Sequence, residues 1–167
     1  MYLPAIGSLV FLVLVVAGLM VRKLRSNAGI GGVYYLRKSL FTPAERSFFG
    51  VLEALAMPEV TVVSKVRLAD IFGVAKGLGR GARQGALNRI SIKHVDFLLL
   101  QKSDGKPILG IELDDASHDE DGRVARDLFV NEVFASADLP ILHIPVKTAY
   151  NPSRLRQEID AALTKSG

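Results

Sequence analysis

The chain contains no cysteine, which excludes disulfide bridges, thiolate metal sites and cysteine nucleophiles. It has no GxxxxGK[ST] string, and its glycine spacing does not fit the dinucleotide-binding fingerprint, so the usual phosphate loops are excluded as well. The sequence shows no internal repeat and no low-complexity tract. Its 167 residues leave room for one domain of ordinary size and an appendage.

Charge is absent from the first 21 residues, and residues 3–21 form a mostly apolar run. About 20 such residues span a hydrocarbon core. Arg22, Lys23 and Arg25 follow, which favours the cytoplasm for that end. A cleaved signal peptide is the alternative, but no basic residue precedes the run and no convincing small-residue cleavage site follows it. We expect a membrane anchor in residues 1–22 with the N-terminus outside, and a cytoplasmic remainder.

Acidic residues are absent from residues 71–93, and the net charge of +4 belongs entirely to the part after residue 21. A basic domain beside a membrane is attracted to anionic lipid or to nucleic acid. The glycine-rich stretch of residues 72–88 predicts a mobile loop whose phosphate contacts give affinity without sequence preference. A solvated or lipid-facing surface loop is the alternative. The predicted phosphate contacts are Lys76, Arg80, Arg83 and Arg89.

We expect residues 23–40 to be a juxtamembrane linker and residues 41–167 to be one α/β domain. Thr42, Pro43 and Glu45 fit the N-cap, first and third positions of a helix with a capping box, and Pro58 closes that helix. A helix over 119–138 should place Val124, Leu128 and Phe134 on its inner side. The other expected elements are strands at 60–66, 92–100, 108–114 and 140–144, and a last helix from 151 to about 163.

Residues 111–118, IELDDASH, place acids on an otherwise apolar strand. Side chains two apart on a strand share a face, so Glu112 and Asp114 point together. Asp96 lies on the preceding apolar strand, and a short turn lets it face Glu112 across a hairpin. Adjacent carboxylates repel each other, and a divalent cation such as Mg²⁺ or Mn²⁺ relieves that repulsion. The pattern predicts a metal site, with solvated or arginine-paired acids as the alternative.

The order helix, strand, strand, strand, helix, strand, helix, with acids on the second and third strands, resembles the PD-(D/E)xK nuclease superfamily. Within it, the chain is similar to the uncharacterised bacterial unknown-function family 2726, often found behind a membrane anchor. The resemblance implies a restriction-endonuclease-like αβββαβ core, a mixed sheet flanked by helices, after one transmembrane helix in the bacterial inner membrane. It covers about residues 38–147, and its strings are LFTPAE (40–45), KVRL (65–68), KHVDF (93–97), IELDDASH (111–118), RD (126–127) and LPIL (139–142).

The resemblance implies that Asp96 and Glu112 hold one or two magnesium ions and that Leu113 lends its backbone carbonyl. Such a metal lowers the pKa of bound water and offsets charge on the scissile phosphate. The superfamily's lysine two residues after the glutamate is Asp114 here, which we count as a further metal ligand. Another cation is therefore needed.

Lys65 on the first strand is our prediction for that cation. Lys93 is disfavoured because, three residues before Asp96, it faces the opposite side of a regular strand. Some superfamily relatives use a first-helix glutamate at the metal site, and Glu45 matches that position. The capping box explains Glu45 equally well without any function.

His118 follows the acidic strand and is a predicted general base, phosphate contact or metal ligand, with a structural role as the alternative. His94 and His143 carry weaker signals, and we expect His143 to be structural. On the second helix, Arg126 is a predicted phosphate contact and Asp127 orients a neighbour through an ion pair.

The leading functional hypothesis is a membrane-anchored, divalent-metal-dependent nuclease-like domain that hydrolyses phosphodiester bonds, with DNA favoured over RNA as its partner. The alternative is a catalytically inactive nuclease fold that binds nucleic acid or another partner at the membrane, which Asp114 favours. A lipid-surface adaptor that uses the basic loop for anionic headgroups is a third reading.

Overall fold

The computed structural model describes residues 14–20, 34–55, 57–114 and 120–164, with side chains from residue 128 onward in the last range. Contacts divide the chain into two compact units, Met1–Leu40 and Phe41–Gly167. In the first unit, residues 14–20 are helical, and most of the predicted anchor lies outside the described residues. Within the described ranges, no helix is long and apolar enough to cross a membrane.

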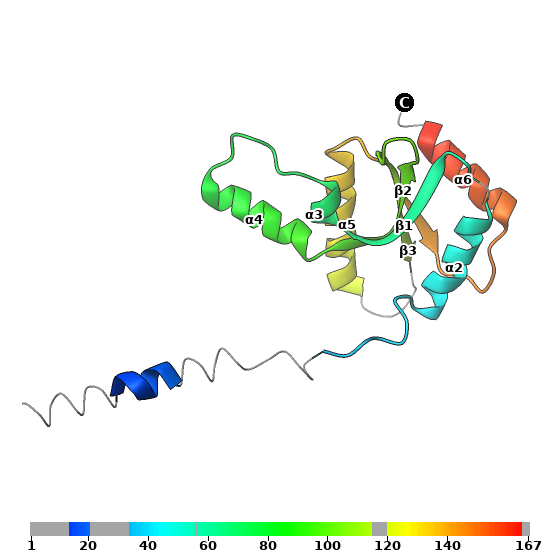
Figure 1. The fold of residues 1–167 in the computed structure, drawn as a ribbon. Helices are drawn as coiled ribbons and strands as arrows, with labels where there is room; N and C mark the ends of the chain where they lie inside the picture. Colours follow the sequence, from blue (N-terminus) through cyan, green and yellow to red (C-terminus); the bar gives the residue numbers. More distant parts are fainter. Residues whose placement is uncertain (1–13, 21–33, 56, 115–119, 165–167) are drawn as a thin grey trace, which may run out of the picture. The chain divides into compact units, whose positions relative to one another are not determined.

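The second unit is a mixed α/β domain built on a four-stranded mixed sheet flanked by helices (Figure 1). Strands β1 and β2 pair antiparallel, as do β2 and β3, whereas β3 and β4 are parallel and α5 connects them. The elements are α2 (Pro43–Ala54), β1 (Val60–Arg67), α3 (Leu68–Ile71), α4 (Arg80–Ser91), β2 (His94–Gln101), β3 (Pro107–Asp114), α5 (Glu120–Ala135), β4 (Ile141–Pro145) and α6 (Pro152–Thr164).

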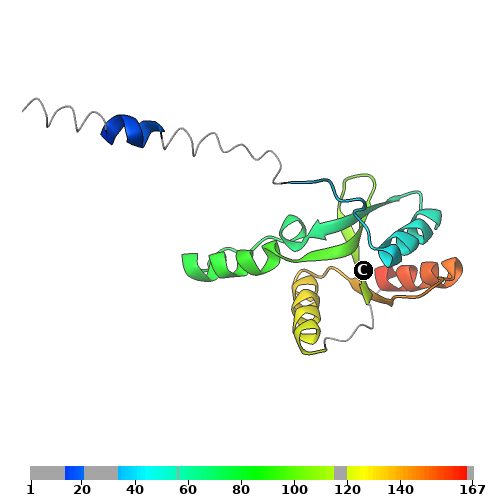
Figure 2. The ribbon, with the colours of Figure 1, turned by 90° about the horizontal axis from the view of Figure 1, so that it is seen from below.

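The sheet is covered on both faces, as Figures 1 and 2 show. Alternating strand side chains send Phe97, Leu99, Leu109 and Ile111 into a core with α2 and α6. The opposite face packs Leu98 and neighbouring residues against α3, the base of α4 and α5. Both cores are built from hydrophobic residues, so the polar residues at the end of the sheet are not explained by core packing.

The predicted capping box of α2 is confirmed. The Thr42 backbone N–H donates to Glu45 Oε2 at 2.8 Å, and the Glu45 N–H donates to Thr42 Oγ1 at 3.3 Å. Pro43 occupies the first turn, where its missing N–H costs nothing. Phe48 and Leu52, spaced one turn apart, are 0% and 1% exposed and fasten the helix to the sheet. Glu45 is thereby held at the end of the sheet.

Two expectations about helices were wrong. Residues 80–88 of the glycine-rich stretch are not loop but belong to α4, which runs to Ser91 and is anchored by the buried Ile90. On α5, Phe134 is buried as predicted, but Leu128 is 58% exposed and Val130 is buried instead, so the inner face is rotated from the predicted one. Val130 and Phe134 are one helical turn apart and define that face together. Val124 lies outside the described side chains.

Candidate functional site

A cavity of about 340 Å³ opens where the N-terminus of α2, the distal part of β1, the start of β2 and the end of β3 meet. Phe97 pairs with Ile111 in the hairpin register, so Asp96 and Glu112 lie next to that pair, on the opposite sheet face. The structure brings both acids to the same cavity. The residues lining it are Glu45, Lys65, Ile92, Lys93, His94, Asp96, Glu112, Leu113 and Val130.

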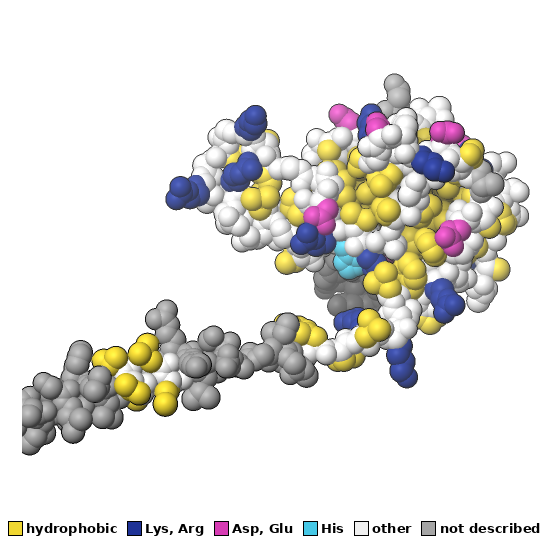
Figure 3. Space-filling model, viewed as in Figure 1, with side chains coloured by type: hydrophobic (Ala, Val, Ile, Leu, Met, Phe, Trp, Pro, Cys, Tyr) yellow, Lys and Arg dark blue, Asp and Glu magenta, His cyan; other side chains and the backbone are white. Residues whose placement is uncertain are grey.

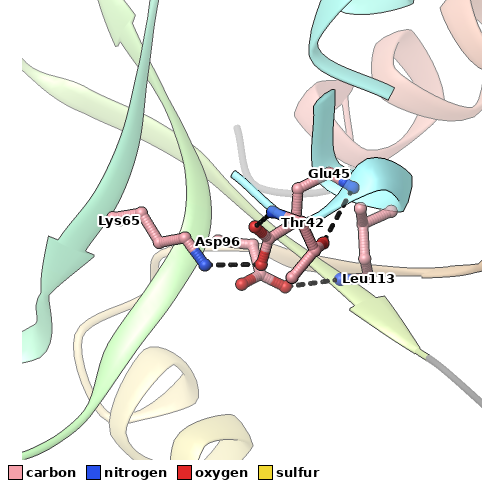
Figure 4. A network of polar contacts seen from close by, with 5 residues as sticks. All are labelled: Thr42, Glu45, Lys65, Asp96 and Leu113. Carbon is pink, nitrogen blue, oxygen red and sulfur yellow. Dashed lines mark hydrogen bonds and ion pairs between the residues drawn. The ribbon is translucent and has the colours of Figure 1, made fainter. Parts of the chain in front are cut away.

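Asp96 is oriented by the strand beside it. The backbone N–H of Leu113 donates to Asp96 Oδ2 at 3.0 Å (Figure 4). Among the described residues, Asp96 Oδ1 accepts no hydrogen bond. A carboxylate that is held by one oxygen, with no described residue bonded to the other, is suited to bind a cation or to accept a proton.

Lys65 crosses from β1 to the capping glutamate of α2. Its Nζ lies 2.5 Å from Glu45 Oε1, and Figure 4 shows the Asp96 carboxylate beside this pair. The two side chains are 24% and 11% exposed, so the ion pair is largely shielded from water. Glu45 therefore caps α2 with one oxygen and holds Lys65 with the other. The two readings of Glu45 from the sequence, cap and site residue, are compatible in this geometry.

The pKa of Glu45 lies below its ordinary value. Burial, the largest single influence, acts to raise that pKa because it disfavours the charged form. The hydrogen bond from Lys65, the hydrogen bonds from Thr42 and the charge of Lys65 together outweigh burial. Glu45 is thus ionised at neutral pH.

Lys65 has a backbone φ of +56°, which is uncommon for a residue with a side chain. On β1 it follows Ser64, which pairs with Phe97, and precedes Val66, which pairs with Val95, so it lies opposite Asp96. A left-handed conformation costs a lysine roughly 1–2 kcal/mol, and such strain gathers at functional sites. Lys65 therefore combines a strained backbone with a side chain that contacts Glu45 and lines the cavity.

Asp114 does not join the other acids. Its Oδ1 lies 3.2 Å from His143 Nδ1, and His143 Nε2 lies 2.8 Å from Asn131 Oδ1 on α5. In the part of the chain that the structure describes, no group of three or more His, Cys, Asp or Glu side chains could hold a metal ion. The predicted three-acid cluster of Asp96, Glu112 and Asp114 is therefore not assembled by these side chains.

The strand alternation that disfavoured Lys93 does not apply to this residue. Strand β2 begins at His94, so Lys93 precedes the strand. Lys93 lines the cavity, and its Nζ is 5.6 Å from the centre of the Phe129 ring on α5. His94, a weak signal in the sequence, lines the cavity too. Both residues come just before Asp96 in the sequence, and this closeness to an acidic strand was the feature from which their place at the cavity could have been predicted.

Three of the five predicted phosphate contacts share one helix, and Lys76 lies in the loop before it. Arg80, Arg83 and Arg89 lie on α4, and Arg83 and Arg89 also have intramolecular partners. The Arg83 guanidinium donates to the Val74 carbonyl at 3.1 Å, and the Arg89 guanidinium stacks 4.0 Å from the Phe129 ring. The side chains of three predicted site residues, His118, Arg126 and Asp127, lie outside the described part of the chain.

Comparison with known proteins identifies a family. No curated protein and no solved structure matches the chain. A family model described as "Protein of unknown function (DUF2726)" matches residues 37–163. That range includes the cavity and all four strands of the sheet. The chain therefore belongs to the DUF2726 family.

Proposed function

We propose that the domain hydrolyses phosphodiester bonds in nucleic acid with a divalent metal ion, as a member of the PD-(D/E)xK type with a restriction-endonuclease-like core. The observation that carries this proposal is the convergence of Asp96, Glu112 and Lys65 on one cavity from three strands. Acids and a strained lysine serve neither apolar core of the domain. Their presence together supports a chemical role.

The donor set fits magnesium or manganese in a limited way. Mg²⁺ is usually bound through one or two carboxylates, and water and substrate phosphate complete its coordination shell. Asp96 and Glu112 provide that number, and the backbone carbonyl of Leu113 is the proposed third ligand. When bound there, the metal would supply an activated water and offset charge on the phosphate.

Lys65 would take the part of the lysine that is missing at position 114. An ammonium has three N–H donors, and the bond to Glu45 uses one of them. The other two can donate to a phosphate oxygen at the cavity. Glu45 would act as a positioning residue because its carboxylate holds the Lys65 amine in place. His94 and Lys93 add two further groups that can contact an anionic substrate.

The second candidate is an inactive nuclease fold that binds nucleic acid or another partner. The observation in its favour is Asp114, which occupies the usual lysine position and pairs with His143 instead of joining the cavity. In this case, Lys65, Lys93 and the α4 arginines would bind phosphate without cleavage.

We further propose attachment to the bacterial inner membrane through residues 3–21, with the domain in the cytoplasm. The support is the uncharged apolar run followed by basic residues. The test is fractionation of cells that express the full chain, with carbonate and detergent washes of the membrane fraction. Release of the chain by carbonate alone would refute an integral anchor.

The test of the activity compares the full chain with Asp96→Asn/Glu112→Gln. Calorimetry would measure Mn²⁺ and Mg²⁺ binding, and a fluorescent DNA duplex would report cleavage. We expect the variant to lose both metal binding and metal-dependent cleavage. The matched control, Glu53→Gln/Asp138→Asn, removes one Glu and one Asp charge from exposed positions outside the cavity and should retain both. A folded wild-type chain that binds DNA without metal and never cleaves it would favour the inactive module.

A further inference from the structure

Helix α4 stands apart from the rest of the domain. It extends away from the sheet and the other helices in both ribbon views (Figures 1 and 2). Nine of its 12 residues are exposed, Ala86 and Leu87 are half-buried, and Ile90 alone is buried. At 1.5 Å per residue the helix is about 18 Å long. A helix with so little buried surface gains little from packing, which indicates that its exposed faces serve something else.

The charge of α4 is also one-sided. From residue 71 to residue 93 the chain has five basic residues and no acid. Figure 3 shows Lys and Arg side chains on this part of the molecule and no Asp or Glu. Arg80 occupies the first turn, where the helix dipole favours an acid, so this residue works against the stability of the isolated helix. The arrangement is complementary to a polyanion.

Two of the α4 arginines attach the helix to neighbouring segments of the domain. Arg83 ties the helix to the preceding loop through Val74, and Arg89 stacks on Phe129 of α5. Arg80 makes no ion pair with any described residue, and neither does Lys76 in the loop. Arg83 and Arg89 therefore hold α4 in position, while Arg80 and Lys76 have no acidic partner among the described residues and can bind an anion.

The outward face carries amide groups that can form hydrogen bonds with base edges. Gln84 and Asn88 are one turn apart, on the side away from Ile90, and share a hydrogen bond of 2.8 Å. Each keeps further donors and acceptors for a partner. Asn and Gln pair with adenine and Arg pairs with guanine in the major groove of B-DNA, which is wide enough for an α-helix. The major groove of an RNA duplex is too deep and narrow for such side chains.

The arm leads directly into the cavity. Helix α4 ends at Ser91, and the next three residues, Ile92, Lys93 and His94, line the cavity with Asp96. A helix of about 18 Å covers roughly five base pairs at 3.4 Å per step. With α4 in the major groove, the DNA backbone would therefore pass the carboxylates of the cavity within about half a helical turn of the bases that α4 contacts.

From these observations we propose that α4 is an arm that enters the major groove of double-stranded DNA and positions the duplex at the cavity. This inference rests on the proposed action on nucleic acid and names its substrate class. Phosphate contacts from Lys76 and Arg80 supply affinity, and Gln84 and Asn88 supply preference among sequences.

The test measures binding of the full chain in EDTA, so that metal-dependent cleavage does not interfere. The probes are a DNA duplex, an RNA duplex of the same sequence, and phosphatidylglycerol vesicles. We expect Lys76→Gln/Arg80→Gln to weaken DNA binding roughly 10- to 100-fold at about 0.1 M salt. The slope of log K against log salt should fall by about 2 in magnitude. The control, Lys106→Gln/Arg154→Gln, removes the same charges from exposed positions outside α4 and should change neither value.

Selection from a randomised duplex pool should enrich a sequence with the wild-type chain and none with Gln84→Ala/Asn88→Ala. The proposal would be overturned if the RNA duplex bound as tightly as the DNA duplex. It would also be overturned if Lys76→Gln/Arg80→Gln bound DNA with wild-type affinity. If the wild-type chain bound vesicles but not DNA, and Lys76→Gln/Arg80→Gln lost the vesicle binding, α4 would instead be a lipid-binding element. If DNA bound through α4 but was not cleaved in Mg²⁺, the role of α4 in DNA binding would be supported and the proposed hydrolase activity would be refuted.

Discussion

The ion pair between Glu45 and Lys65 is open to a direct energetic test. Glu45→Gln removes the charge and keeps a side chain that can still complete the capping box, since Gln also serves at the third helical position. Lys65→Gln removes the amine and leaves the strained backbone of that residue in place. The double variant closes the cycle, so the coupling between the two residues is separated from the cap and from the strain.

The expected coupling follows from burial. Exposed ion pairs contribute about 0.2–1 kcal/mol, and breaking a fully buried pair costs about 3–5 kcal/mol. With side chains 11% and 24% exposed, this pair lies between these limits. Hydrogen bonds to charged groups contribute about 1.5–3 kcal/mol, and we therefore expect a coupling free energy of about 2 kcal/mol at pH 7.

The same pair makes stability depend on pH. The pKa of Glu45 is lowered in the folded state, so the folded state binds its proton less tightly than the unfolded state does. The contribution is complete above the unfolded pKa of about 4.3 and is lost as the pH falls through the lower folded value. The difference in stability between the wild-type chain and Glu45→Gln should therefore shrink from pH 5 toward about pH 3.

Urea unfolding of the full chain, followed by circular dichroism across this pH range, would measure both effects. Arg154→Gln and Glu158→Gln form a control cycle on an exposed pair of α6, with an expected coupling below about 1 kcal/mol. If Glu45 and Lys65 coupled no more strongly than this control, or if the pH dependence were unchanged in Glu45→Gln, the amine would not be held as described. The positioning role of Glu45 would then fail.

Four substitutions test the backbone of the domain, each by urea or thermal unfolding. Gly110→Ala should destabilise the fold by about 2–3 kcal/mol, because a Cβ there would lie 2.4 Å from the ring of the buried Phe134; an unchanged stability would contradict this packing of α5 on β3. Gly81→Ala and Gly85→Ala should each stabilise α4 by about 1 kcal/mol, because their Cβ atoms would meet nothing and Ala is the better helix former. Lys65→Gly should be about 1 kcal/mol more stable than Lys65→Gln, because both lose the ion pair and only glycine relieves the positive φ.

The elements that could be predicted depend on residues close together in the sequence. The capping box joins Thr42 to Glu45, three positions apart, and the alternation of β3 sets which acids point away from the core. These patterns identified α2 and the acidic hairpin from the sequence. The choice of Lys65 also came from such reasoning, as the lysine of a strand beside the acids.

What could not be predicted depends on distant contacts. Nothing near Lys65 in the sequence signals a left-handed backbone, and its partner Glu45 is 20 residues away. The glycines of residues 77–85 favoured a loop, yet α4 forms because Ile90 is buried and Arg89 stacks on a helix 40 residues further on. Strand alternation predicted that Asp114 would lie with Glu112, but in the fold His143 on β4 is the partner of Asp114.

The two candidate functions make opposite demands on the carboxylates of the cavity. In a nuclease, Asp96 and Glu112 bring the metal to the phosphate, so Asp96→Asn/Glu112→Gln should abolish any gain in DNA affinity that Ca²⁺, a non-hydrolysing substitute, provides. In an inactive module, the same carboxylates only repel the phosphate backbone, so neutralising them should strengthen DNA binding with and without Ca²⁺. We expect the first result in a filter-binding titration with a DNA duplex. Stronger binding by the variant in both conditions would refute the metal site, because no ion would then join the acids to the substrate.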